Sequence, residues 1–92
     1  MPSGAVHIIA SGRVQGVGFR YFVRHKALSM GIKGFVRNLE NGDVEILAEG
    51  NNDDLDLFIE EIRNGPSVAH VDNLQKDWRE PSGIFSTFDI AF

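Results

Sequence analysis

A change of hydrophobic period at residues 12–20, GRVQGVGFR, constrains the fold more than any other feature of the sequence. Through residues 5–13 apolar and more polar side chains alternate, which is the period of a strand with one buried face. From position 19 to position 30 apolar side chains instead recur at helical spacing, and Gly31 follows where glycine commonly ends a helix. The sequence therefore predicts a strand, a glycine-rich bend and a helix in direct succession.

The rest of the chain predicts one more helix and four more strands. The expected elements are, in order, strand 33–39, a turn at Asn41-Gly42, a strand around 44–48, a helix from Asn51 or Asn52 to Gly65-Pro66, a strand over about 69–78 and a short strand over Phe88, Ile90 and Phe92. The Asn-Gly pair is the strongest short hairpin signal, because both residues tolerate positive φ. Asp53 and Asp54 favour a helix start there, since acidic side chains stabilise the positive end of the helix dipole.

The order strand, helix, strand, strand, helix, strand predicts an α/β fold of the α+β sandwich type, the ferredoxin-like βαββαβ pattern. In this pattern a four-stranded antiparallel sheet carries two helices on one face. The length fits a single domain over residues 1–92, in which residues 1–4 are expected to form a mobile tail. RNA-binding modules, metal carriers, regulatory domains and small enzymes all use this pattern, so the fold alone leaves the function open.

Charge is divided unevenly along the chain. Residues 1–39 carry six Arg or Lys and no acidic residue, whereas residues 40–92 carry all 13 acidic residues and three basic ones. The two parts therefore have charges of +6 and −10, which give the net charge of −4. A basic segment around the glycine-rich bend favours an anionic ligand, and the acidic remainder argues against nucleic acid as a partner.

Cysteine content and apolar run length indicate the compartment. The chain contains no cysteine, so disulfides and thiol catalysis are excluded. Its apolar runs are only a few residues long, and its first residues lack the basic start and apolar segment of a signal peptide. We therefore expect no membrane partner and a cytoplasmic location.

The glycine-rich bend has the composition of an anion site. Gly16 and Gly18 permit positive φ, so that successive N–H groups can curl toward one point. The helix that follows adds free N–H groups and a positive dipole end, and Arg20 lies near its start with forked donors that match phosphate oxygens. The competing interpretation is a tight turn without a ligand. The bend lacks the Lys and Ser/Thr of a nucleotide P-loop and the third small residue of a dinucleotide fingerprint.

The segment GFVRN, residues 34–38, supplies a candidate partner for this bend. In the expected fold the second strand lies close to the entry of the first helix, so Asn38 at its end is expected to face Arg20. A neutral amide offers both a donor and an acceptor, which suits it to hold a water beside an anionic phosphate. The alternative is that Asn38 only flanks the hairpin turn.

These segments together resemble the acylphosphatase family. The resemblance is carried by VQGVGFR, Ala27, Gly31, GFVRN, NGDVEI and Gly50, and it extends over most of the chain. It implies hydrolysis of an acyl phosphate to a carboxylate and inorganic phosphate by a small monomer, with phosphate or sulfate as product-like ligands. No metal and no cofactor are implied. Many members have Asp-Gly in the hairpin where this chain has Asn41-Gly42, and either pair suits the turn.

The resemblance also implies roles for individual residues. The arginine of the first motif, here Arg20, binds the phosphate together with backbone amides of the loop. The asparagine of the second motif, here Asn38, positions the attacking water. The residues expected to bind phosphate are Gln15, Gly16, Val17, Gly18, Phe19 and Arg20.

Two other classes of function compete with an enzyme. The same loop serves equally in a module that binds phosphate without turnover, although such a module has no use for a water-holding amide. A single-stranded RNA binder is permitted by the fold, but the first strand lacks the aromatic residues that stack bases in RNA-recognition modules. The histidines His7, His25 and His70 share no metal-ligand spacing, and the acidic residues Glu40, Asp43 and Glu45 are read as a solvated turn rather than a cation site.

Overall fold

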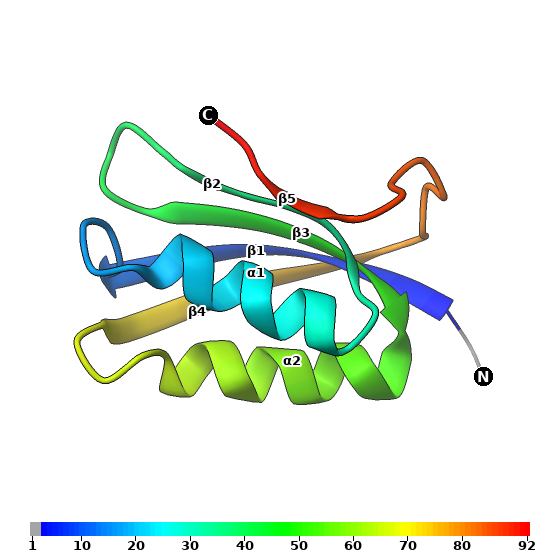
Figure 1. Cartoon of the computed structure of the whole chain (residues 1–92), viewed down its shortest axis with the longest axis horizontal. Coiled ribbons are helices and arrows are strands. Elements are labelled where there is room, and N and C mark those ends of the chain that lie inside the picture. The colour runs from blue at the N-terminus through cyan, green and yellow to red at the C-terminus, as the bar shows by residue number, and fades with distance from the viewer. Residues whose placement is uncertain (1–2) are drawn as a thin grey trace.

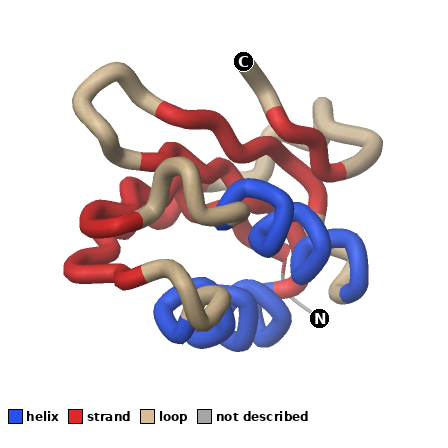
Figure 2. The backbone as a smooth tube through the Cα atoms, turned by 60° about the vertical axis from the view of Figure 1, so that its left-hand side comes forward, coloured by secondary structure: helices blue, strands red, loops and turns tan. Residues whose placement is uncertain are grey.

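A computed structural model describes residues 3–92, which form a layer of strands and a layer of two helices (Figure 1). The elements are β1 (Ser3–Arg13), α1 (Phe19–Ser29), β2 (Lys33–Asn38), β3 (Val44–Asn51), α2 (Asn52–Asn64), β4 (His70–Arg79) and β5 (Phe88–Ile90). Both helices lie on the same side of the sheet (Figure 2). The order of elements expected from the hydrophobic periods is therefore confirmed.

The sheet has five strands rather than four, in the order β4-β1-β3-β2-β5. The four long strands pair antiparallel, as expected for the βαββαβ pattern, and β5 adds to β2 in parallel, with Gly34 beside Phe88 and Val36 beside Ile90. The sequence indicated this last strand by its alternation but not its partner, because a strand of three residues carries no signal for its neighbour. Phe92, expected in that strand, lies beyond its end.

The first strand begins earlier than the sequence indicated. Ser3 and Gly4, expected in a mobile tail, belong to β1 and lie opposite Asn51 and Gly50 of β3. The other two residues of the expected tail lie outside the described residues. Polar and small residues at a strand end carry little β signal, so the backbone pairing with β3 was not visible in the sequence.

Local chemistry fixes both ends of α2. The Asn51 side chain accepts a hydrogen bond from the Asp53 N–H at 2.9 Å, so Asn51 is the capping residue of the two considered. Asp53 and Asp54 occupy the first turn, where their charge favours the helix dipole. Gly65 ends the helix with a φ of 64°, a conformation that glycine adopts without steric cost.

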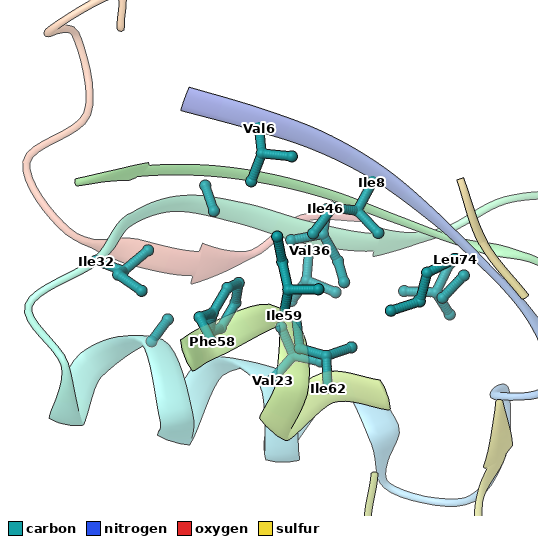
Figure 3. Packing of buried hydrophobic residues seen from close by; sticks show 14 of the residues in the cluster. Val6, Ile8, Val23, Ile32, Val36, Ile46, Phe58, Ile59, Ile62 and Leu74 are labelled. Atoms are coloured by element: carbon teal, nitrogen blue, oxygen red, sulfur yellow. The ribbon is translucent and has the colours of Figure 1, made fainter. Parts of the chain in front are cut away.

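The core lies between the helical layer and one face of the sheet. Alternate residues of β1 and β3 and one stripe of each helix meet there, as Figure 3 shows for Val6, Ile46, Val23 and Ile62. Phe58 of α2 packs edge-on against Phe88 of β5 with ring centroids 6.1 Å apart, which ties the short fifth strand to the core. No helix among residues 3–92 is long and apolar enough to cross a membrane.

The connections that carry the two motifs share one end of the molecule. The bend between β1 and α1 and the turn between β2 and β3 both lie at the left in Figure 1. The connections from α1 to β2 and from β4 to β5 lie at the opposite end (Figure 1). The fold therefore brings the predicted site residues, separate in sequence, to one end of the sheet.

Candidate active site

The bend between β1 and α1 has the backbone conformation that its glycines predicted. Gly16 and Gly18 have φ values of 73° and 75°, in the left-handed region. A Cβ at either position has no atom within 4 Å, so the glycines are needed for conformation and not because of crowding. Val14 and Phe19 are buried on either side and hold the ends of the bend in the core. The exposed residues of the bend, including Gly16 and Gly18, therefore lie between two residues anchored in the core.

The start of α1 has unsatisfied donors. Gly18 occupies the capping position, so no side chain accepts a hydrogen bond from the first turn, and no acidic residue lies in that turn. Free N–H groups and the positive end of the helix dipole therefore face outward beside the bend. The half-buried Arg20 lies in the same turn. Its fixed charge and the backbone donors make this the electropositive end of the helix.

The side chain of Gln15 joins the bend to the β2–β3 turn. Its Nε2 donates one hydrogen bond to the Leu39 carbonyl oxygen and one to the Asp43 carbonyl oxygen, both at 2.8 Å. Leu39 and Asp43 also bond to each other, from the Leu39 N–H to the Asp43 carbonyl at 2.9 Å, and so form the mouth of the hairpin. One amide thus holds the loop of the first motif against the strand end of the second.

Asn38 is the last residue of β2 and directly precedes the mouth of this hairpin. Successive side chains of a strand point to opposite faces, so Asn38 points to the same face as Val36, which is buried beneath the helices. Asn38 is itself exposed, because it lies beyond the edge of the core. It therefore faces the side of the sheet on which α1 begins. None of the hydrogen bonds found among residues 3–92 joins Asn38 to Arg20.

The guanidinium of Arg20 has an aromatic neighbour. Its central carbon lies 5.5 Å from the centre of the Phe92 ring, within the range of a cation–π contact. This contact was not predicted from the sequence. The sequence predicted Phe92 only as part of the last strand, and nothing in the sequence placed that strand beside β2.

Two carboxylates lie on the outer face of the sheet, away from the helices. Glu45 binds His7 at 2.7 Å and also accepts a hydrogen bond from Arg37. Burial raises the pKa of Glu45, but hydrogen bonds from His7 and Arg37 outweigh it, so the pKa lies below the ordinary value of 4.5. Of the three acidic residues expected to form a solvated turn, Glu45 therefore differs from Glu40 and Asp43, because it is ion-paired with His7 and Arg37. No cluster of three His, Cys, Asp or Glu with metal-binding geometry occurs in the described part of the chain.

The second carboxylate, Glu49, anchors the connection between β4 and β5. It accepts hydrogen bonds from the Ser82 N–H at 3.0 Å, the Ser82 hydroxyl at 2.7 Å and the Gly83 N–H at 3.1 Å. Burial raises the pKa of Glu49, and these hydrogen bonds lower it further than burial raises it. A cavity of about 280 Å³ lies beside this anchor, lined in part by Lys33, Glu49 and Phe85. It is at the end opposite the glycine-rich bend, so it forms no part of the candidate site.

Comparison with known proteins identifies the family. The acylphosphatase family model matches residues 6–90. The chain belongs to the acylphosphatase family. An acylphosphatase from Pelotomaculum thermopropionicum is 39% identical over 100% of both chains, and one from Caldanaerobacter subterraneus is 44% identical over 92% of this chain and 94% of the relative.

Solved structures of acylphosphatases have the same fold. The crystal structure of acylphosphatase from Bacillus subtilis matches with a TM-score of 0.94 and 38% identity, over 97% of this chain and 99% of the other. The ferredoxin-like α+β fold is therefore that of the acylphosphatases. Membership of this family favours a hydrolase over the two competing interpretations, an anion-binding module and an RNA binder.

Proposed function

We propose that this acylphosphatase hydrolyses the carboxyl–phosphate bond of small acyl phosphates without a metal ion or cofactor. Arg20 and the backbone amides of residues 15–19 bind the phosphate group, and Asn38 positions the attacking water. The observation that carries the proposal is the loop conformation, in which two left-handed glycines precede an uncapped helix whose first turn contains an arginine.

The loop provides several donors for a single phosphate. A hydrogen bond to a charged group contributes about 1.5–3 kcal/mol, and a helix N-terminus contributes about 0.3–1 kcal/mol more to an anion. The planar guanidinium of Arg20 presents paired N–H donors that match two phosphate oxygens at once. Three or four such contacts are enough for binding in the micromolar to millimolar range, after the cost of immobilising the ligand.

The reaction that this site supports needs little acid–base chemistry from the protein. The oxygen of a water molecule attacks phosphorus, the bond from phosphorus to the bridging oxygen breaks, and its electron pair leaves with the carboxylate. A carboxylate is a stable leaving group that needs no general acid. The proton of the water passes to a phosphate oxygen. Positioning and charge stabilisation therefore carry most of the catalysis, through Asn38 and Arg20 respectively.

Hydrolysis of benzoyl phosphate in the presence of EDTA tests the proposal. We expect turnover by the wild type and, for Arg20→Ala, a loss of about a hundredfold or more in kcat/KM together with weaker inhibition by inorganic phosphate. We expect Asn38→Ala to lose kcat by a similar factor while the inhibition constant of phosphate changes less than about threefold. Arg24→Ala, one turn further along α1, and Asn73→Ala on β4 are the matched controls, because both residues are exposed.

Two outcomes contradict the proposal. A folded wild type that binds phosphate but does not accelerate hydrolysis is an anion receptor and not an enzyme. Hydrolysis in ¹⁸O-labelled water that puts the label into the carboxylate shows attack on carbon, which the proposed placement of Asn38 does not allow. A monomeric state and a cytoplasmic location are further parts of this proposal, tested by light scattering and by cell fractionation.

A further inference from the structure

The fifth strand brings the last residues of the chain to the candidate active site. β5 runs parallel to β2, and the Ala91 N–H continues the pairing by donating a hydrogen bond to the Val36 carbonyl at 2.8 Å. Because the strands are parallel, residues 91 and 92 run beside Arg37 and Asn38, toward the same end of the sheet. Figure 1 shows the chain leaving β5 toward the end that carries the β2–β3 turn.

The position of Phe92 is unusual for a large apolar side chain. Phe92 is 99% exposed, although its ring lies 5.5 Å from the guanidinium of Arg20. A phenylalanine ring with this exposure adds little to the core. Its surface is therefore available to a molecule that binds beside Arg20.

The contact between the two residues leaves the arginine free to bind phosphate. A ring interacts with a guanidinium over its flat face, whereas the N–H donors of a guanidinium point outward in its plane. The contact is made with the central carbon of the guanidinium, and no protein acceptor of an Arg20 N–H hydrogen bond is found among residues 3–92, so the donor edge of Arg20 remains available to an anion. A phosphate on that edge is joined to its acyl group by a single oxygen atom, so the acyl group begins within a few ångströms of the ring.

We propose that Phe92 forms the acyl-group subsite and determines specificity for substrates whose acyl group is aromatic. The proposal rests on the proposed function, since it assumes that Arg20 binds the phosphate group. An aromatic acyl group buries the exposed ring of Phe92 and stacks on it, whereas an acetyl group reaches little of it. Contacts between two aromatic rings correspond to a preference of about twofold to tenfold.

The test compares kcat/KM for benzoyl phosphate and acetyl phosphate in one set of variants. We expect the ratio of benzoyl to acetyl to fall by about threefold to tenfold in Phe92→Ala, to fall less in Phe92→Leu, and to be retained in Phe92→Tyr, which keeps the ring. Trp78→Ala is the control, because Trp78 is another exposed aromatic residue but lies opposite Val6, toward the end of β1 that is far from the bend. Its ratio should equal that of the wild type.

The result that overturns the proposal is an equal loss for both substrates in Phe92→Ala, with weaker inhibition by inorganic phosphate. That result makes Phe92 a residue that only restrains Arg20. A wild type that hydrolyses neither substrate contradicts the proposed function instead. In that case the ratio of dissociation constants for benzylphosphonate and methylphosphonate, which need no turnover, tests the subsite, and an equal ratio in wild type and Phe92→Ala rejects it.

Discussion

Removal of the Gln15 side chain should uncouple the two motifs while the fold stays intact. In Gln15→Ala the carbonyl groups of Leu39 and Asp43 each lose one hydrogen bond of 2.8 Å. A hydrogen bond between neutral groups contributes about 0.5–1.5 kcal/mol net, and both carbonyls are near enough to the surface to be hydrated instead. We therefore expect Gln15→Ala to destabilise the hairpin mouth next to Asn38 by about 1–2 kcal/mol.

This cost should be seen in the catalytic step. A loss of 1–2 kcal/mol in the alignment of the attacking water corresponds to a decrease in kcat of about fivefold to thirtyfold. Steady-state hydrolysis of benzoyl phosphate measures kcat, and inhibition by inorganic phosphate reports on the phosphate site. Gln15→Glu should lose more, because its carboxylate places negative charge against two carbonyl oxygens. The matched control is Gln75→Ala, since Gln75 is exposed on β4.

A double-mutant cycle shows whether Gln15 acts through Asn38. If it does, Gln15→Ala should lower kcat much less in an Asn38→Ala background than in the wild type, because the side chain that Gln15 positions is already absent. Additive losses would refute this reasoning and assign Gln15 to the phosphate loop alone. A decrease in phosphate affinity as large as the decrease in kcat would lead to the same conclusion.

Three further predictions concern other parts of the structure. Gly18→Ala should lower kcat/KM at least tenfold and stability by about 1–2 kcal/mol, because its φ of 75° disfavours a Cβ; kinetics and urea unfolding measure both. Glu49→Gln should lower the free energy of unfolding at pH 7 by about 1–3 kcal/mol. The folded-state pKa of Glu49 lies below 4.5, so the Glu49 carboxylate stabilises the fold above pH 4.5 and loses this effect as the pH falls through the folded-state pKa. The free energy of unfolding of Glu49→Gln should therefore decrease less on acidification than that of the wild type. Phe88→Ala should cost about 3–5 kcal/mol in urea unfolding, because Phe88 is fully buried against Phe58.

Each of these predictions has a contrary result. Full activity in Gly18→Ala means that the loop does not depend on its left-handed residues. If the free energy of unfolding of Glu49→Gln depends on acidic pH in the same way as that of the wild type, the Glu49 carboxylate does not contribute to acid unfolding. A cost below 1 kcal/mol for Phe88→Ala means that β5 is not tied to the core as described.

The parts of the fold that the sequence predicted are those set by local physics. The periods of α1 and α2, the glycines of the bend and the Asn41-Gly42 turn all act within a few residues. The partner of β5 was not predictable, because pairing between strands distant in sequence depends on the space left by the finished core. The start of β1 at Ser3 was missed for the same reason, since pairing with Asn51 supplies the order there.

The candidate site divides in the same way. The backbone conformation at Gly16 and Gly18 followed from residue type, and the sequence placed Asn38 at the end of its strand. The roles of Arg20 and Asn38 remain predictions. The side-chain bonds of Gln15 and the contact of Phe92 with Arg20 were not visible in the sequence, because each joins segments that only the three-dimensional arrangement of the sheet brings together.

The strand order leaves the sheet with two open edges, and both oppose growth into larger aggregates. β4 forms one edge, where charged side chains such as Lys76 and Asp77 are exposed, and only Leu74 is buried. The other edge is β5, which offers only three residues to a passing strand. Charged and short edge strands are features by which natural sheets avoid pairing with other chains. We therefore expect aggregation to begin only when β4 separates from β1 and leaves the apolar strand β1 as an exposed edge.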